Sequence, residues 1–231
     1  MLYRGNKRRI AREVLSFMPR ANYFIEPFVG GGGMTMYAVE SGKFKEFLCS
    51  DINDLVIDYF LSLQSGWFPD EHYSREQFNE MKVLHKNKDY SKYSKAEICT
   101  VGFSCAFLCK FLSSYRSSGN SYKYPYTNAE KDLKFVNACN FRCCSYKEIE
   151  IPEKRCVIYC DPPYQSVLGY PTGAFDHEEF YEWAKEMSKD HYVYVSEENM
   201  PAGWKCIWNK EIGPVGGMTR PRIEKLFTLK N

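Results

Sequence analysis

The chain has 231 residues, of which 44% are hydrophobic, and its 31 Lys and Arg nearly balance 29 Asp and Glu to leave a net charge of +2. This length and apolar content predict one α/β domain with room for a small inserted lobe. The balanced charge gives no support from bulk electrostatics to nucleic-acid binding, and no apolar run approaches the length that a membrane span needs.

The ten cysteines are scattered along the chain, with no Cys-x-x-Cys pair and no histidine near Cys105 and Cys109. No secretory signal precedes them, so we expect free thiols in a reducing cytoplasm and no metal site. Basic residues gather at the start, in the middle and late in the chain, and each cluster taken alone predicts a solvated face. The late cluster, Arg220 and Arg222, is assigned to a loop.

The first elements alternate between helices and short apolar strands. Residues 8–18 carry apolar side chains on one side of a predicted helix. A strand over 23–29 leads into four glycines at 30–33, and the helical stretch 34–39 follows. This is the layout of a nucleotide-binding βα unit, in which glycines let a ligand approach the backbone. The loop lacks the G-x-G-x-x-G spacing and the P-loop lysine, which argues against dinucleotide and ATP phosphate binding.

A second strand over 44–50 ends at an acidic residue, Asp51, and a helix over 55–63 follows. An acid in this place can accept hydrogen bonds from the two hydroxyl groups of a ribose. The next residue, Ile52, is suited to lie against an adenine face. A tight turn with Asp51 as a helix cap is the alternative that this segment alone leaves open.

The segment from 64 to 128 breaks the alternation of strands and helices. It is rich in Tyr, Lys and Ser, with helices expected over 75–85 and 95–112. Residues 113–126 are polar and aromatic and predict a loop or hairpin. Basic side chains between tyrosines suit phosphate contact and base stacking, and a disordered surface loop is the alternative. The residues expected to contact a nucleic acid are Arg116, Asn120, Tyr122 and Lys123.

The most informative feature is the tetrapeptide Asp161-Pro162-Pro163-Tyr164, which follows an apolar strand over 157–160. Neither proline has an N–H group, so the strand must end there and the chain leaves the sheet on a stiff path. A carboxylate, the Pro162 carbonyl and an aromatic ring then lie at the carboxyl end of a strand, where α/β proteins bind ligands. The acceptors suit an exocyclic amino group, and the ring suits stacking on a planar base. A turn with a packed tyrosine is the alternative.

The strand and helix pattern resumes near Leu133 and continues towards the end of the chain. A helix capped at Asp176 or its neighbours is expected to run through Met187. Three further strands are predicted, over 191–195, 205–208 and 225–229.

The strings FIEPFVGGGGM, SDIN and DPPY occur in this order, after an opening YRGNK and before a late VSEENMP and EKLF. In these motifs, which span nearly its whole length, the chain resembles the Dam-type DNA adenine-N6 methyltransferases of the D12 class and alpha group, particularly their phage-borne branch. The resemblance implies an α/β fold, with a Rossmann-like S-adenosylmethionine-dependent methyltransferase sheet and an inserted, mainly helical target-recognition lobe. It implies a catalytic domain of residues 1–63 and 129–231 and a DNA target-recognition domain of residues 64–128.

The resemblance also implies S-adenosylmethionine as the methyl donor. Where the family often ends its third strand with an Asp-Phe pair that binds the adenine of the donor, this chain has Ser145 and Tyr146. A serine still makes one hydrogen bond, so the change bears on donor affinity rather than donor identity. Several glycines of the segment 102–111 are replaced by Leu and Cys. The residues implied at the donor site are Tyr3, Lys7, Glu26, Pro27, Phe28, Gly30, Gly32, Asp51, Ile52, Ser145 and Asp161.

The implied reaction is direct methyl transfer to N6 of adenine in duplex DNA, by a monomer in the cytoplasm of a bacterial host. The base must leave the duplex, stack on Tyr164 and present its amino group to Asp161 and the Pro162 carbonyl, which stabilise the developing positive charge. No cysteine nucleophile is needed, in contrast to C5-cytosine methylation. The alternatives are methylation of cytosine N4, an RNA or free-nucleotide substrate, and an inactive DNA-binding protein with this fold. The recognised DNA sequence and any restriction partner are left open.

Overall fold

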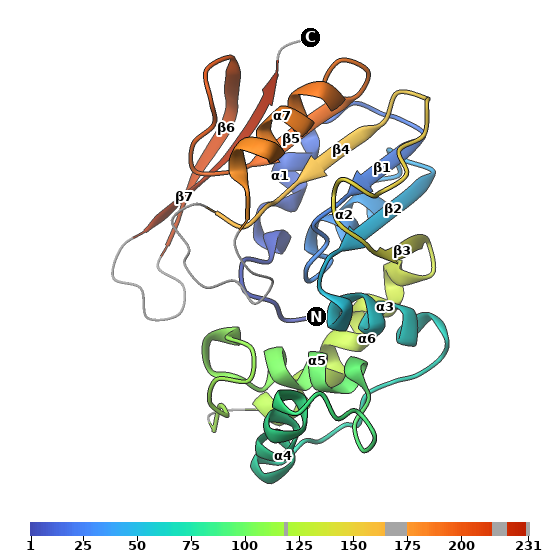
Figure 1. The fold of residues 1–231 in the computed structure, drawn as a ribbon, viewed down its shortest axis with the longest axis vertical. Helices are drawn as coiled ribbons and strands as arrows, with labels where there is room; N and C mark the ends of the chain where they lie inside the picture. The colour runs from blue at the N-terminus through green and yellow to red at the C-terminus, as the bar shows by residue number, and fades with distance from the viewer. Residues whose placement is uncertain (118–119, 165–174, 214–220, 230–231) are drawn as a thin grey trace.

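The computed structural model describes residues 1–117, 120–164, 175–213 and 221–229. The strands of its central sheet are β1 Tyr23–Glu26, β2 Glu46–Asp51, β3 Cys139–Cys143, β4 Val157–Cys160, β5 Tyr192–Ser196, β6 Trp204–Ile212 and β7 Arg222–Leu229. Their order is β3-β2-β1-β4-β5-β7-β6 (Figure 1), with β1 to β5 parallel and β7 antiparallel to both β5 and β6. The order reverses between β1 and β4, the kind of switch point at which α/β sheets bind ligands. The predicted Rossmann-like α/β fold is confirmed.

Helices lie on both faces of the sheet and also build a separate group, which is the lower part of the view in Figure 1. The α-helices are α1 Ala11–Ser16, α2 Gly33–Glu40, α3 Asp54–Gln64, α4 Arg75–Lys86, α5 Lys95–Ser104, α6 Tyr124–Val136 and α7 His177–Met187. The 3-10 helices are η1 Lys7–Arg9, η2 Phe107–Cys109 and η3 Ser121–Lys123. All ten cysteines are free thiols, and in the described part of the chain no helix is long and apolar enough to cross a membrane.

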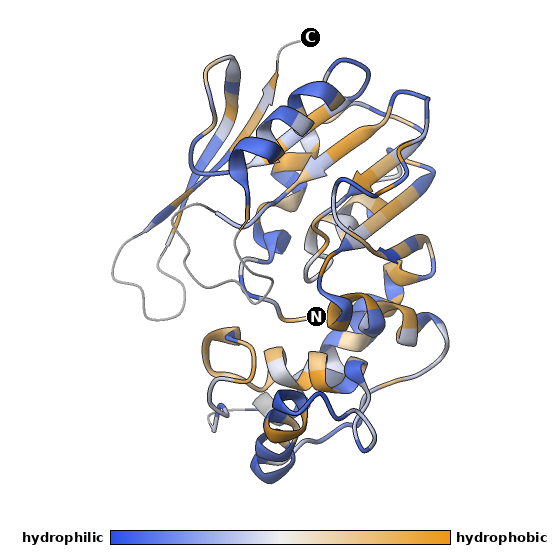
Figure 2. Cartoon of the chain, in the orientation of Figure 1, coloured by the Kyte–Doolittle hydropathy of each residue, from blue (hydrophilic) through white to orange (hydrophobic). Residues whose placement is uncertain are grey.

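Alternating residues of the central strands face two different layers. Phe24, Val157 and Tyr159 belong to the core that α1, α2, α3 and α6 share, whereas Ile25 and Ile158 belong to the core beneath α7. Because both faces are covered, β4 is apolar throughout, and β1 carries one charged residue, Glu26, at its carboxyl end. Figure 2 shows this as an orange β1 and β4 beside a largely blue α7. The sequence predicted both strands, but the strand expected over 23–29 ends at Glu26, directly before Pro27.

The predicted elements flanking the Asp161–Tyr164 motif are confirmed almost to the residue. The strand β4 begins and ends where it was predicted, because all four of its residues are buried and two prolines follow it. The helix α7 begins after Asp176, whose side chain accepts a hydrogen bond from the Glu179 N–H at 3.0 Å, and it ends at Met187.

The helical group contains α4 and α5 and has a core of its own. Ser74 caps α4 through a reciprocal capping box with Gln77, and Ser94 caps α5. These caps start the helices where the sequence predicts them, at Arg75 and Lys95. The core of this group consists of Tyr73, Phe78, Met81, Tyr93, Ile98, Val101, Cys105, Ala106 and Leu112.

The helix expected over 95–112 ends at Ser104, so the second half of this prediction is wrong. The chain instead turns back over α5. The N–H group of Leu112 donates to the carbonyl of Gly102 at 2.9 Å. The ring of Phe111 lies so close to Gly102 that a Cβ atom there would approach it to 2.4 Å. A reversal held by this contact therefore replaces the last turns of the predicted helix.

The loop expected over 113–126 is also shorter than predicted. The helix α6 begins at Tyr124, with Pro125 in its first turn, where a missing N–H group costs no hydrogen bond. Residues 118–119 of the expected loop lie outside the described residues. The expected domain boundary at residue 128 falls inside α6, which contacts α2, α3 and α5.

Candidate active site

A cavity of about 510 Å³ opens at the carboxyl ends of β1, β2 and β4, beside the switch point of the sheet. This volume is in the range of small-molecule sites. Its walls come from the amino-terminal segment, the loops after β1, β2, β3 and β4, the turn after α5, the start of α7 and the start of β7. The predicted donor residues that line it are Tyr3, Lys7, Glu26, Pro27, Phe28, Gly30, Asp51, Ile52, Ser145 and Asp161.

The glycine loop after β1 is covered by the amino-terminal segment of the chain. A Cβ atom on Gly31 would lie 2.6 Å from both Tyr3 and Asn6, and one on Gly33 would lie 2.0 Å from the amide oxygen of Asn6. Gly32, with φ of 67°, does not line the cavity, since a Cβ atom there would meet the rings of the core at 2.7 Å. The glycines therefore have a structural cause that the sequence analysis missed, which is close contact with residues 3–8.

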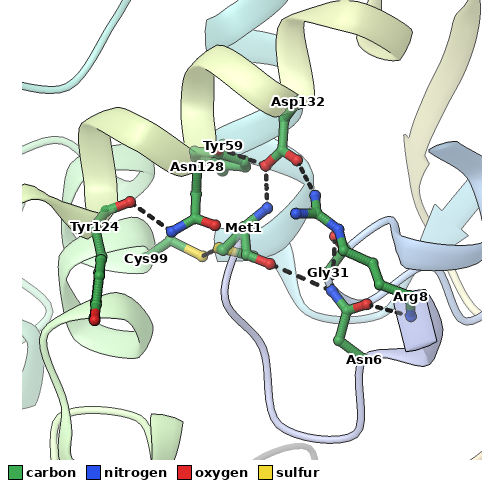
Figure 3. Close-up of polar contacts among 9 residues, drawn as sticks. All are labelled: Met1, Asn6, Arg8, Gly31, Tyr59, Cys99, Tyr124, Asn128 and Asp132. Atoms are coloured by element: carbon green, nitrogen blue, oxygen red, sulfur yellow. Dashed lines mark hydrogen bonds and ion pairs between the residues drawn. The ribbon is translucent and has the colours of Figure 1, made fainter. Parts of the chain in front are cut away.

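A buried polar network holds this amino-terminal segment in place (Figure 3). The Asn6 amide donates to the carbonyls of Met1 and Gly31, both at 3.3 Å, and accepts from the Arg8 N–H at 3.0 Å. The fully buried Asp132 of α6 forms ion pairs with Arg8 and with the Met1 amine. Asp132 also accepts a hydrogen bond from the Tyr59 hydroxyl at 2.9 Å, as Figure 3 shows. The network fixes η1, and with it Lys7, the first residue of that helix.

The acid at the end of β2 has two of its acceptor positions occupied by backbone groups. The Asp51 carboxylate accepts hydrogen bonds from the N–H groups of Gly30 and Asn53, each at 2.9 Å. Burial raises the pKa of Asp51, and these hydrogen bonds oppose that rise. A carboxylate has about four acceptor positions, so these backbone hydrogen bonds leave acceptor capacity for a ligand in the cavity. The adjacent Ile52 side chain is 59% exposed and gives the cavity an apolar edge.

The floor between β1 and α7 combines a buried acid with aromatic rings. Glu26 is 3% exposed and accepts a hydrogen bond from the Thr35 hydroxyl, and burial raises the pKa of Glu26 well above its usual value. The ring of Phe28 stacks on that of Tyr146, with centroids 5.6 Å apart, and meets the edge of Phe175 at 5.8 Å. Aromatic packing therefore shapes this wall of the cavity.

Ser145 lines the cavity where the family often has an acid. Its N–H and its hydroxyl both donate to the Glu148 carboxylate at 2.9 Å. These two hydrogen bonds lower the pKa of Glu148, a residue that does not line the cavity. The hydroxyl proton of Ser145 is thus used in the turn between residues 145 and 148. Only the hydroxyl oxygen remains, as an acceptor for a group in the cavity.

The Asp161–Tyr164 motif is joined to the amino-terminal segment and to β7. The Lys7 ammonium lies 2.9 Å from Oδ1 of Asp161 and 3.5 Å from Oε2 of Glu224. The Tyr164 hydroxyl donates to the same Oε2 atom at 2.9 Å. Burial raises the pKa of Asp161, and the Lys7 ammonium opposes this rise. Asp161 and Tyr164 line the cavity, whereas Pro162 is buried and does not.

Two residues of this constellation, Arg222 and Glu224, were not predicted. Glu224 is 6% exposed, and Arg222 lines the cavity at the start of β7, so its assignment to a loop is wrong. Its neighbour in that assignment, Arg220, lies outside the described residues. Glu224 stands directly before the strand predicted over 225–229, and the local sequence pattern did not mark it as a site residue.

The residues predicted to bind DNA lie away from the cavity, around the start of α6. The Arg116 guanidinium is 5.8 Å from the ring of Tyr124, and the Lys123 ammonium is 5.7 Å from the ring of Tyr122. The Asn120 carbonyl accepts a hydrogen bond from the Lys123 N–H at 2.9 Å. The helical group instead reaches the cavity through Phe103, Cys109, Lys110 and Phe111.

Comparison with known proteins places this geometry in a family. Residues 3–206 match the model of the D12 class N6 adenine-specific DNA methyltransferases. The chain belongs to this family. The resemblance stated from the motifs is thereby confirmed.

Three relatives of this D12-class chain illustrate the similarity. The DNA adenine methylase of Vibrio cholerae is 27% identical over 178 residues, which are 69% of this chain and 62% of the relative. The retron Ec67 DNA adenine methylase of Escherichia coli is 26% identical over 219 residues, covering 84% and 75%. The DNA N-6-adenine-methyltransferase of Escherichia phage P1 is 24% identical over 180 residues, covering 70% and 23%. Similarity to solved structures is low: TrmN from Thermus thermophilus, at 9% identity, aligns over 96% of this chain and 49% of that one with a TM-score of 0.42.

Proposed function

We propose that this chain transfers a methyl group from S-adenosylmethionine to the N6 amino group of adenine in duplex DNA. One observation carries the proposal. The carboxylate of Asp161 and the ring of Tyr164, at the end of β4, line the same cavity as Asp51, at the end of β2. A site for a nucleoside and a site for an amino-bearing base are thus joined in one space. Membership of the D12 class supports this reaction.

The residues on the β1 and β2 side of the cavity fit the donor. The free acceptor positions of Asp51 suit the two ribose hydroxyls, and the exposed Ile52 side chain suits the face of an adenine. The backbone from Glu26 to Gly30 lines the space that remains for the methionine part. When bound, S-adenosylmethionine supplies an electrophilic methyl group. The Ser145 oxygen offers a weaker acceptor than an acid, so we expect modest donor affinity.

The residues on the β4 side fit the acceptor. A duplex hides the N6 group of adenine, so the base must flip out of the stack to reach the cavity. There Tyr164 stacks on the base, and Asp161 and the Pro162 carbonyl accept the two N6 hydrogens. These acceptors direct the nitrogen lone pair and stabilise the positive charge that develops on the nitrogen. Lys7, 2.9 Å from Asp161, keeps this carboxylate ionised and oriented.

The helical group supplies the contact to DNA in this proposal. We assign target recognition to residues 64–128 and catalysis to residues 1–63 and 129–231, with α6 crossing the junction. Arg116 and Lys123 contact phosphates, and Asn120 and Tyr122 contact bases. The clustering of these side chains around the start of α6 supports the assignment. The same helix carries Asp132, which pairs with Arg8, so α6 connects the proposed DNA contacts to the amino-terminal segment of the cavity.

A methyl-transfer assay tests the function directly. The protein is incubated with S-adenosylmethionine and unmethylated duplex DNA or RNA, and the nucleosides are identified by mass spectrometry. We expect N6-methyladenine from DNA, and a loss of at least about 100-fold in the isosteric variant Asp161→Asn. The exposed Asp190→Asn serves as the matched control. N4-methylcytosine, a product from RNA alone, or full turnover by Asp161→Asn would each contradict the proposal.

A further inference from the structure

The ring on which the target base is expected to stack is covered in this structure. Tyr164 is only 4% exposed. The guanidinium carbon of Arg222 lies 4.3 Å from the centroid of the ring, and the Lys7 ammonium lies 4.9 Å from it. Cations are attracted to aromatic faces, so these contacts are favourable in the absence of DNA. A flipped base cannot stack on the ring until a covering group leaves.

The two cations near the ring differ in how firmly they are held. Lys7 is 6% exposed and is fixed between the carboxylates of Asp161 and Glu224. The Arg222 side chain is 34% exposed, lines the cavity and stands at the first residue of β7. Its Nε atom forms an ion pair with Glu224 at 3.2 Å but no hydrogen bond within the described residues, and its guanidinium also interacts with Tyr164 and Asp161. Arg222 is therefore the cation that can leave the ring.

The strand β7 keeps Tyr164 oriented when Arg222 moves. Residues 222 and 224 are two apart in a strand, so their side chains point to the same face of the sheet. Glu224 accepts the Tyr164 hydroxyl at 2.9 Å and lies 3.5 Å from Lys7. These contacts do not involve Arg222. The ring consequently stays in place while the group above it is exchanged.

Building on the proposed function, we propose that Arg222 is a placeholder for the target base. In the protein without DNA, its planar guanidinium occupies the stacking position on Tyr164, and the flipped adenine displaces it. The guanidinium suits this role because it is flat and stacks on aromatic rings. The contact keeps a buried ring covered before DNA binds, and it opposes entry of a base. Arg222 is thus a positioning residue that makes base flipping less favourable, because its contact with Tyr164 must be broken first.

The consequence can be measured as an effect on base flipping. A cation–π contact contributes a factor of about 2 to 30 in an equilibrium constant. In Arg222→Ala, the flipped state should be favoured by this factor, and the Kd for a target duplex should fall accordingly. Arg222→Gln keeps a planar group without the charge and should give an intermediate value. The exposed Arg142→Ala, on β3, is the matched control and should leave both quantities unchanged.

The experiment has two stages, so that its failure differs from a failure of the proposed function. First, the wild-type protein must produce N6-methyladenine, and sequencing the marked DNA gives the target site. Then 2-aminopurine replaces the target adenine, and its fluorescence and the duplex Kd are measured for each variant. Tighter binding with stronger fluorescence in Arg222→Ala supports the placeholder. Weaker binding with reduced flipping would show that Arg222 holds the base, and unchanged values in both Arg222→Ala and Arg222→Gln would equally overturn the inference. Thermal unfolding of each variant identifies a misfolded Arg222→Ala, in which case Arg222→Gln decides.

Discussion

Replacing Lys7 by methionine tests the electrostatics of the site most directly. Lys7 is 6% exposed, and its ammonium lies 2.9 Å from Asp161 and 3.5 Å from Glu224. Methionine keeps a flexible apolar stem and removes the charge. Arg222, whose Nε atom lies 3.2 Å from Glu224, is then the remaining cation that interacts with both carboxylates within the described residues. We expect the pKa of Asp161, already raised by burial, to rise further, because Lys7 is the main group that opposes the rise.

The cost follows from the geometry. Coulomb's law with an effective dielectric constant of about 20 gives roughly 6 kcal/mol for charges 2.9 Å apart. Part of this energy offsets the desolvation of Lys7. The net loss is reduced further because the Asp161 side chain is 19% exposed and still interacts with the Arg222 charge. We therefore expect Lys7→Met to destabilise the protein by about 3 kcal/mol, the lower end of the range for breaking a buried ion pair.

Activity should change in a way that packing alone does not produce. Transfer needs the ionised form of Asp161, so activity falls as pH drops through its pKa, and a higher pKa moves this acid limb to higher pH. The assay compares kcat/KM between about pH 5 and pH 9 for the wild type, Lys7→Met and the exposed control Lys45→Met. Urea unfolding gives the stability of each. A Lys7→Met variant with the wild-type pH profile and a stability change below about 0.5 kcal/mol would refute the reasoning.

Three further changes give independent tests. Burial raises the pKa of Glu197 from 4.5 to about 7, so this carboxyl holds its proton longer in the folded chain and stability falls as pH rises through that window. Glu197→Gln should remove this loss of stability. In urea unfolding, the free energy of unfolding should rise by about 1–3 kcal/mol above pH 7 and stay unchanged below pH 4.5; an equal effect at both pH values would contradict this. Asp51→Asn should weaken S-adenosylmethionine binding by about 1–3 kcal/mol in calorimetry, and unchanged affinity would exclude the ribose contact. Tyr164→Phe should cost about 1–2 kcal/mol of stability, because Glu224 loses its donor, yet it should keep more activity than Tyr164→Ala.

The sequence predicted the acids of the site because of a property of parallel sheets. The carboxyl ends of parallel strands lie at one edge, so Asp51 after β2 and Asp161 after β4 had to be near each other. The same reasoning could not find Arg222 and Glu224. Their strand, β7, is antiparallel to β5, so its first residues, rather than its last, reach that edge. In an antiparallel strand, the amino end reaches the edge where the parallel strands have their carboxyl ends. The direction of a strand within its sheet depends on the tertiary fold, which the local sequence pattern does not encode.

Errors in the helical group have a similar origin. Periodicity supported a helix through residue 112, but Leu108 and Cys109 have positive φ values of 56° and 53°, which lie outside the α-helical region. The contact of Phe111 with Gly102, nine residues away in sequence, supports the reversal. The start of α6 was readable in principle, since Pro125 is typical of a first helical turn. Its tyrosine-rich surroundings favoured the prediction of a loop instead.

The glycine run shows how one sequence signal can have two causes. It suggested a close approach by a ligand, and Gly30 and Gly31 do line the cavity. The closest contacts are nevertheless internal, because Asn6 packs against Gly33 and donates to the carbonyl of Gly31. The consecutive residues Lys7 and Arg8 then pair with Asp161, which follows β4, and with Asp132 of α6. The 3-10 helix η1 therefore links the glycine loop, Asp161 and α6. The glycines are needed for this link to form, whether or not a ligand is bound.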